Sequence, residues 1–267
     1  MDYPRITRLY KYTKFNARTM ASLVAGKLWF PSPKYFNDPF DCAVLDHVNG
    51  TELERTISNK IFIKRPKLTQ EVKNTNMDTE SVLREIHNKF LTTVTIREQE
   101  LLEISRHAQE TLQDSLYSFG VLSLSASAKS ILMWSHYAAN HTGICMEFER
   151  CQENRLGQDA KPVKYSKNRL IVQQNENDLP SVLFIKHSGW RYEREWRLLE
   201  NKPNQLHDMP GKLKTVICGA RMPNEHIDVV SSIVDTLNSH RTDKLKLMHA
   251  QMKPTTFSIK IENVKRN

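Results

Sequence analysis

Two glutamates separated by one residue are the clearest candidates for chemistry in this sequence. Glu193 and Glu195 lie in the stretch Gly-Trp-Arg-Tyr-Glu-Arg-Glu-Trp-Arg-Leu, residues 189–198. If this stretch is a β-strand, alternate side chains point to opposite faces, and both glutamates share a face with Arg191 and Arg197. Aromatic residues on the other face indicate a strand that enters the core. We therefore expect the carboxylates to line a cleft.

A carboxylate pair flanked by guanidiniums fits more than one kind of site. Glu193 and Glu195 could hold magnesium in a metal-dependent nuclease, which needs carboxylate ligands. They could instead form a structural ion-pair network with Arg191 and Arg197 in a non-catalytic binding module. A third possibility is an enzyme that uses the carboxylates without a metal. The residues in the rest of the sequence are needed to distinguish the three.

Length and composition indicate a soluble globular protein. The chain has 267 residues, of which 39% are hydrophobic and 26% charged, values typical of a globular protein. This length allows one large domain or two small ones, and we expect a single α/β domain over 1–267. No stretch approaches the length of a membrane span, and the first residues lack the layout of a signal peptide. The four cysteines are scattered without a Cys-x-x-Cys pair, which disfavours disulfides and structural zinc. We expect a cytoplasmic protein with no membrane partner.

The charge balance favours acidic partners. The formal net charge is +9, which suits a nucleic acid, an acidic protein or a phosphorylated small molecule. No Gly-x-Gly-x-x-Gly phosphate loop occurs. His136 and His141 are five residues apart and would lie on different faces of a helix, so we expect no metal.

Short strands and turns precede a long helical segment. Residues 8–12 are predicted to form a first strand, and Asn16 is predicted to cap a helix that ends near Gly26. Residues 27–30 form a second expected strand. The following Asn37-Asp38-Pro39 sequence forces a turn between aromatic residues, and such a rigid loop can hold a ligand. Apolar residues at helical spacing then predict a mainly helical insertion at about 51–117.

The second half of the chain alternates strands and helices. Residues 119–125 read as a strand that ends in Ser123-Leu124-Ser125, followed by a helix over 131–138 and a strand over 144–149. A helix over 180–187 is expected to lead into the Glu-x-Glu strand. Residues 215–218 predict a last core strand, residues 223–237 a helix, and the remainder one or two terminal strands.

Several of these segments together resemble a bacterial family, the domain of unknown function 2971. The resemblance rests on five motifs: Leu9–Tyr12, Phe36–Phe40, Ser123–Ser125, Met133–Ala138 and Tyr192–Arg197. They run from near the N-terminus to residue 198. The family name supplies no chemistry.

The order of the motifs is also similar, more distantly, to the Arg, Ser-x-Ser, Glu-x-Glu pattern of mono-ADP-ribosyltransferases. That resemblance implies an α+β fold with split antiparallel β-sheets, here with the helical insertion between the first and second motifs. It implies NAD as the substrate, with Glu195 catalytic and Glu193 selecting or activating the acceptor. The implied NAD-binding residues are Tyr10, Lys11, Tyr12, Asn37, Ser123, Ser125 and Tyr137. The first strand departs from the usual Arg or His, so Arg8, Tyr10, Lys11 and Tyr12 all stay candidates for the first motif.

The implied reaction has a physical rationale in these residues. Cleaving the bond between nicotinamide and ribose develops an oxocarbenium-like cation, which a carboxylate such as Glu195 stabilises. Lys11 or Arg8 would neutralise the pyrophosphate, and Tyr137 with a tyrosine of the first strand would sandwich the nicotinamide. We expect transfer of ADP-ribose from NAD to a protein, nucleic-acid or small-molecule acceptor. A toxin or phage-defence role is a further hypothesis, suggested by how bacterial transferases of this kind are used.

Overall fold

The computed structural model describes residues 3, 5–43, 109–168 and 179–264, together with residues 99, 103, 106 and 107. The chain divides into two compact units, the first comprising residues 1–43, 115–170 and 174–267 and the second residues 44–114 and 171–173. The described residues of the second unit are helical. Most of the helical insertion predicted at about 51–117 lies outside the described residues, although residues 109–117 are helical.

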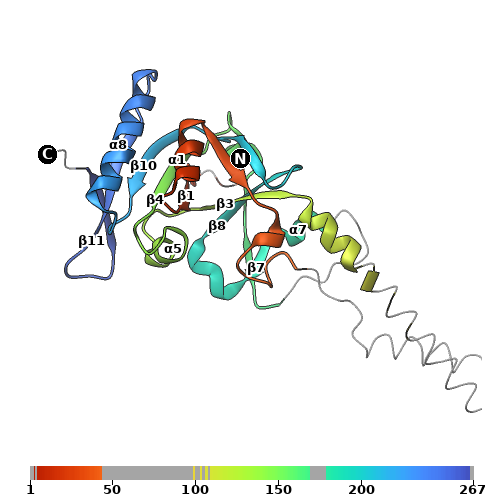
Figure 1. The fold of residues 1–267 in the computed structure, drawn as a ribbon. Coiled ribbons are helices and arrows are strands. Elements are labelled where there is room, and N and C mark those ends of the chain that lie inside the picture. The colour runs from red at the N-terminus through yellow and green to blue at the C-terminus, as the bar shows by residue number, and fades with distance from the viewer. Residues whose placement is uncertain are drawn as a thin grey trace, which may run out of the picture. The chain divides into compact units, whose positions relative to one another are not determined.

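A large mixed sheet forms the centre of the first unit. Its strands are β1 (Arg8–Thr13), β3 (Gly120–Ser125), β4 (Ile144–Glu149), β5 (Lys161–Pro162), β8 (Glu195–Glu200), β10 (Leu213–Cys218), β11 (Lys246–Met252) and β12 (Ile259–Asn263). They are arranged in the order β12-β11-β10-β4-β1-β3-β8-β5, visible from β11 to β8 in Figure 1. The β10–β11 pair is parallel and the other pairs are antiparallel. The predicted strands over 8–12, 119–125, 144–149 and 215–218 are confirmed.

Two small sheets and several helices complete the described part of this unit. The small sheets pair β2 (Lys27–Phe30) with β9 (Gln205–Asp208), and β6 (Lys164–Ser166) with β7 (Ile185–His187). The α-helices are α1 (Ala17–Val24), α5 (Ile131–Tyr137), α6 (Arg155–Gln158), α7 (Leu179–Val182) and α8 (Asn224–Ser239), and the 3-10 helices are η1 (Pro33–Tyr35) and η4 (Ser188–Glu193). None of the described helices is long and apolar enough to cross a membrane.

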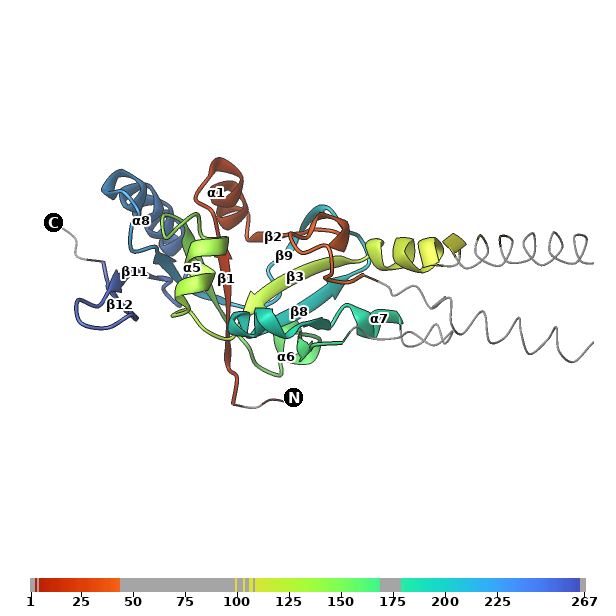
Figure 2. The same cartoon turned by 90° about the horizontal axis from the view of Figure 1, so that it is seen from below.

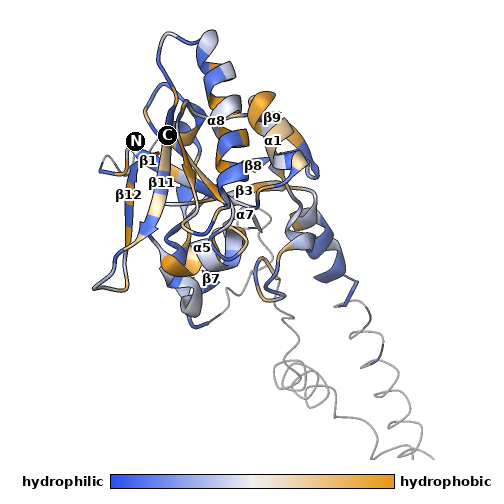
Figure 3. Cartoon of the chain, turned by 60° about the vertical axis from the view of Figure 1, so that its left-hand side comes forward, coloured by the Kyte–Doolittle hydropathy of each residue, from blue (hydrophilic) through white to orange (hydrophobic). Residues whose placement is uncertain are grey.

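The two faces of the large sheet carry separate hydrophobic cores. Alternate residues of a strand point to opposite faces. Accordingly, Met146 of β4 packs with α1 and α8, whereas its neighbour Cys145 packs with α5. In Figure 1, α1 lies above β1 and α5 lies below it, and Figure 2 gives the same helices as seen from below. In Figure 3, α8 shows hydrophilic and hydrophobic residues side by side, as expected for a helix that buries one face.

The large sheet opens between β1 and β3. β1 pairs with β4 from Arg8 to Thr13, but it pairs with β3 at Tyr10 and Ser125 alone. Beyond this point the gap is bridged by a side chain, because the Lys11 Nζ donates a hydrogen bond of 3.0 Å to the Ser123 carbonyl. β3 then pairs with β8 along its whole length. The opening therefore separates a β1-β4-β10 half of the sheet from a β3-β8 half.

The Glu-x-Glu segment differs from the predicted strand. Residues 188–193 form η4, Arg194 adopts a left-handed conformation with φ 47°, and β8 begins only at Glu195. The predicted common face is therefore wrong, because a 3-10 turn does not alternate side chains as a strand does. Arg191 is exposed, whereas Glu193 is buried.

Helix α5 is fixed to the sheet by Trp134. This side chain is fully buried, its indole Nε1 donates a 2.8 Å hydrogen bond to the Ala128 carbonyl, and its ring packs edge-on against Tyr12 of β1. Trp134 thereby sets the position of the following turn of α5, which carries His136 and Tyr137.

We expect Trp134→Phe to lower the free energy of unfolding by about 1–3 kcal/mol, because the buried Ala128 carbonyl loses its donor. Urea unfolding followed by circular dichroism measures the change. Trp29→Phe is the matched control, since Trp29 is partly exposed on β2, and it should cost about 0.5 kcal/mol or less. Equal losses in the two variants would contradict this role of Trp134.

Candidate functional site

A cavity of about 340 Å³ lies at the opening between β1 and β3. Nine of the residues that the sequence assigned to a site line it: Tyr10, Lys11, Tyr12, Asn37, Ser123, Ser125, Tyr137, Glu193 and Glu195. Arg8, the other candidate of the first strand, is not in the lining and pairs with Glu147 at 2.8 Å. They come from β1, the loop after η1, β3, α5 and the η4–β8 junction. The expectation that the two glutamates line a cleft agrees with this geometry, although they reach it from a 3-10 turn and a strand end.

Hydrogen bonds to the main chain hold the η4–β8 junction in place. The Ser125 Oγ donates a 2.6 Å bond to the carbonyl of Glu193, and the Glu195 amide donates a 2.7 Å bond to the Tyr165 hydroxyl. The carbonyl of Arg194 accepts a bond from the amide of Ala126. Ser125 is thus a structural clamp, and its hydroxyl is directed at the protein backbone.

The ammonium group of Lys186 connects three carboxylates beside the cavity. Its Nζ lies 2.6 Å from Glu193 Oε2, 3.2 Å from Glu195 Oε2 and 3.3 Å from Asp41 Oδ2. All four side chains are nearly inaccessible to solvent. Buried charges require such pairing, because an isolated one loses its hydration without compensation.

Arg197 supplies the second cation of this cluster. Its side chain is 0% exposed, and it donates to both carboxylate oxygens of Glu195, at 2.7 and 3.0 Å, and to both of Asp41, at 2.7 and 2.9 Å. We call Asp41, Lys186, Glu193, Glu195 and Arg197 the buried charge cluster. It contains three carboxylates and two cations.

The environment separates the pKa values of the two glutamates. Burial raises the pKa of Glu195, but Arg197 and Lys186 outweigh burial and lower it to about 2. Burial also raises the pKa of Glu193, and here Lys186 does not outweigh it, partly because Glu195 adds repulsion. Glu195 is therefore held ionised, and Glu193 is the carboxylate that takes up a proton more readily.

The two glutamates also differ in free hydrogen-bond capacity. Glu195 receives two bonds from Arg197 and one from Lys186 and is hydrogen-bonded to the Ser123 side chain, which occupies the roughly four acceptor positions of a carboxylate. Glu193 receives one bond from Lys186 and one of 2.5 Å from the Tyr137 hydroxyl. Of the two, Glu193 has more capacity to contact a ligand.

Lys11 lies between the halves of the sheet, near Glu195. Burial lowers the pKa of its ammonium group to about 8, against the opposing effect of Glu195. Within the described residues its Nζ forms no ion pair and donates a hydrogen bond to the Ser123 carbonyl. Lys11 is thus a half-buried cation at the cavity with charge to offer an anion.

The remaining cavity residues are aromatic or amide side chains. The Tyr137 hydroxyl is hydrogen-bonded to the Asn37 side chain as well as to Glu193, so Asn37 and α5 meet across the cavity. Burial and the neighbouring Glu147 raise the pKa of Tyr10 to about 12. The Tyr12 hydroxyl donates to the Ser127 carbonyl, and its ring is buried against α5. Tyr12 therefore contributes mainly to the wall.

Sequence reasoning missed Lys186 and the part played by Asp41. Lys186 was expected in a helix over 180–187, but α7 ends at Val182 and β7 begins at Ile185. The one available signal was a lysine inside an apolar stretch shortly before the glutamates. Asp41 lies just after the predicted turn at Asn37-Asp38-Pro39, and the sequence predicts no charge partner for it. Arg197 was expected to flank the glutamates, and it does so through Glu195.

The described residues contain no group of three or more His, Cys, Asp or Glu side chains arranged to hold a metal ion. The three carboxylates of the buried charge cluster are close together, but their oxygen atoms face Lys186 and Arg197. A magnesium ion would have to displace these ammonium and guanidinium groups. The geometry therefore disfavours Glu193 and Glu195 as ligands of a nuclease metal.

Comparison with known proteins supports one of the two resemblances. The family described as "Protein of unknown function (DUF2971)" matches residues 133–198. The matched segment includes α5 from its third residue, β4, Lys186 and both glutamates. No curated protein matches the chain, and no solved structure matches it. The similarity to the family is thus established for this segment, which carries much of the cavity wall.

We expect Lys186→Met to lower the free energy of unfolding by about 3–5 kcal/mol at pH 7, because three buried carboxylates would then share one guanidinium. The loss should shrink as the pH falls toward 5. Without Lys186 the pKa of Glu193, which burial already raises, rises further above the roughly 4.3 of an unfolded glutamate. The folded state then binds more protons, and stability falls with rising pH. Denaturant unfolding at both pH values tests this.

Lys164→Met is the matched control for the loss of a lysine. Lys164 is exposed on β6, next to β7, and its removal should change the free energy of unfolding by about 0.5 kcal/mol or less. If Lys186→Met is as stable as Lys164→Met at pH 7, the ion pairs of Lys186 do not stabilise the fold.

Proposed function

We propose that the chain transfers ADP-ribose from NAD to an acceptor and that the cavity between β1 and β3 binds the nicotinamide half of NAD. One observation carries this proposal: nine residues assigned from motif order, spread from Tyr10 to Glu195, line a single cavity. At about 340 Å³ the cavity is near the lower end of ligand pockets, about 300–1000 Å³. We therefore assign to it nicotinamide and the adjoining ribose, with the adenylate half outside.

The chemistry of the cavity residues supports this assignment. Tyr10 and Tyr137 offer aromatic faces for the nicotinamide ring, and Lys11 offers a cation for the pyrophosphate. Glu195, ionised and anchored at the first residue of β8, opposes the positive charge that develops on the ribose. Glu193, with free acceptor capacity and a raised pKa, accepts a proton from an acceptor hydroxyl or amine. Protein, nucleic acid and small molecules all remain acceptors under this proposal.

As part of the same proposal, we suggest that the transferase acts as a toxin or in defence against phage. The opening of the sheet between β1 and β3 supports the split-sheet architecture that such transferases have. The net charge of +9 supports an acidic acceptor.

A second candidate function is a non-catalytic binding module. It is favoured by the ion pairs of Glu195, because Arg197 and Lys186 already compensate the negative charge of this carboxylate. An anion so compensated stabilises a developing cation less than a free one does. In this alternative the buried charge cluster shapes the cavity, and the ligand is bound without reaction.

Turnover of NAD separates the two functions. Purified protein is incubated with labelled NAD and cell extract, and nicotinamide release and label transfer are measured. We expect Glu195→Gln to lower the rate by about 10²–10³-fold, as for the loss of a preorganised electrostatic group. A wild-type protein that binds NAD without turnover would support the binding module, and one that neither binds nor turns over NAD would end the transferase proposal.

Loss of stability has to be separated from loss of chemistry, because Glu195 belongs to the buried charge cluster. Arg197→Met is the matched control: Arg197 contacts Glu195 and Asp41 but does not line the cavity. Both variants are assayed at temperatures where the folded fraction is the same. If Arg197→Met loses as much activity as Glu195→Gln, the glutamate acts only through the cluster.

The pKa of Lys11 predicts how NAD affinity depends on pH. The ammonium group is charged below pH about 8 and loses its proton above it, so KM for NAD should rise by about tenfold or more between pH 7 and 9.5 as one charged contact disappears. Lys11→Arg keeps the positive charge and should flatten this dependence. An unchanged pH profile in Lys11→Arg would show that another group causes it.

A further inference from the structure

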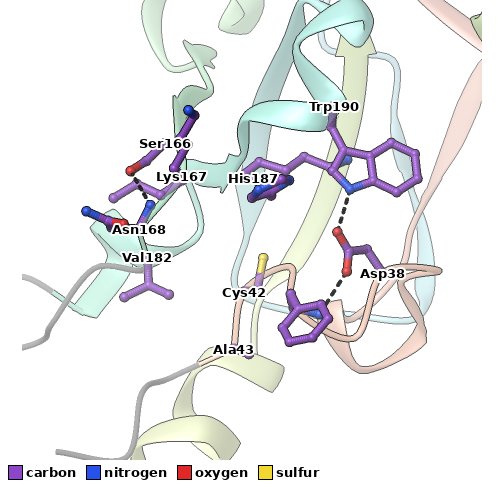
Figure 4. Close-up of a pocket in the computed structure, with 12 residues that line it drawn as sticks. Asp38, Cys42, Ala43, Ser166, Lys167, Asn168, Val182, His187 and Trp190 are labelled. Atoms are coloured by element: carbon purple, nitrogen blue, oxygen red, sulfur yellow. Dashed lines mark hydrogen bonds between the residues drawn. The ribbon is translucent and has the colours of Figure 1, made fainter.

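Figure 4 shows a second cavity, of about 470 Å³. Lys186 lines both cavities, whereas neither Glu193 nor Glu195 lines the second. The turn that contains Asp38 and Cys42 also borders it. A ligand in the second cavity would therefore be separated from the two glutamates, so this cavity is distinct from the proposed NAD site.

One wall of the second cavity is apolar and aromatic. Trp190 of η4 is held by a 2.6 Å hydrogen bond from its Nε1 to Asp38 Oδ2, which fixes the plane of the indole. Phe40 also lines the cavity, and 64% of this side chain is exposed. Val182 and Ile185 add aliphatic surface. The exposed ring of Phe40 can stack on a planar ring. Trp190 is half-buried, and the Lys186 ammonium group lies 5.0 Å from the centre of its ring.

The opposite wall is polar and basic. Figure 4 shows Ser166, Lys167 and Asn168 facing the side with His187 and Trp190 across the cavity. Lys167 is exposed and forms no ion pair within the described part of the chain. Asn168 adds hydrogen-bonding groups to this wall, and His187 adds them from the side of Trp190.

The acidic group of the second cavity is already satisfied. Asp38 accepts hydrogen bonds from the Trp190 indole and, at 2.9 Å, from the amide of Phe40. The charge of Lys186 is likewise engaged by the carboxylates of the buried charge cluster. The carboxylate of Asp38 keeps its negative charge, so we place the anionic group of a ligand beside Lys167, across the cavity from Asp38.

From the aromatic wall and the opposing cation, we infer that the second cavity binds a planar ring carrying a phosphate group, as in a mononucleotide. The ring lies against Phe40 and Trp190, and the phosphate contacts Lys167 and Asn168. The volume falls within the roughly 300–1000 Å³ typical of small-molecule sites. This site goes beyond the proposed transferase activity, and its ligand binds whether or not NAD is turned over.

Binding of AMP to the full chain tests the inference by isothermal titration calorimetry in the absence of NAD. Adenosine lacks the anion and ribose 5-phosphate lacks the ring, so each should bind about tenfold more weakly than AMP or worse. Equal affinity for AMP and ribose 5-phosphate would overturn the role of the aromatic wall. No detectable binding of AMP would overturn the inference as a whole.

Substitutions at two exposed residues test where the nucleotide binds. Lys167→Glu should weaken AMP binding by about tenfold or more through the loss of a charged contact, and Phe40→Ser should weaken it through loss of stacking. Lys164→Glu is the matched control, because Lys164 is an exposed lysine of the same short strand region that does not line the cavity. It should leave the affinity within about twofold.

If Lys164→Glu weakens AMP binding as much as Lys167→Glu, diffuse charge explains the binding and the site is refuted. If Lys11→Met abolishes AMP binding while Lys167→Glu and Phe40→Ser do not, the nucleotide occupies the other cavity and the inference also fails. A single-stranded tetranucleotide with a 5′ phosphate forms a second arm of the experiment. Tighter binding than AMP would assign the site to nucleic-acid ends, and weaker binding would assign it to free nucleotides.

Discussion

The pairing of buried charges around Lys186 is the constraint on which the rest of this structure depends. One ammonium group contacts the carboxylates of Asp41, Glu193 and Glu195, which come from the loop after η1, the end of η4 and the start of β8. Removing these groups from water is costly unless each finds a partner. The three segments must therefore converge, and the walls of both cavities follow from this convergence.

The same constraint gives the two glutamates different properties. Glu195 lies where Arg197 and Lys186 both reach it, which keeps it ionised despite complete burial. Within the part of the chain that the structure describes, the Glu193 carboxylate is hydrogen-bonded to Lys186 and Tyr137, and its pKa is raised. Of two carboxylates separated by one residue, Glu195 is thus a fixed anion and Glu193 is the group that exchanges protons. This division suits acid–base chemistry on a bound substrate, and it also suits a site that selects ligands by charge.

The fold was predictable where periodicity and turn chemistry agree. Strand β4 alternates apolar and polar residues and lies where expected, and α8 has a clear apolar face. The segment 189–194 was mispredicted as a strand because its alternation of aromatic and charged residues is compatible with period two. The left-handed conformation of Arg194 ends the 3-10 turn before β8. The local sequence does not predict this conformation, because the hydrogen bond from Ser125 and the ion pairs of Lys186 join segments that are separated in sequence.

Much of the candidate cavity could likewise be assigned from the sequence. The first-strand motif, Ser-x-Ser and Glu-x-Glu occur in the order that the resemblance to transferases implies, and their residues line the cavity. Lys186 could not be assigned, since its importance comes only from the three carboxylates around it. The second cavity could not be assigned from the sequence either, because its lining residues Phe40, Lys167 and Trp190 come from three separate segments of the chain. The sequence by itself determined the residue types available for chemistry, the main strands and the basic charge. Only the tertiary structure decided which charges are paired and which remain free, because pairing depends on distances between distant segments.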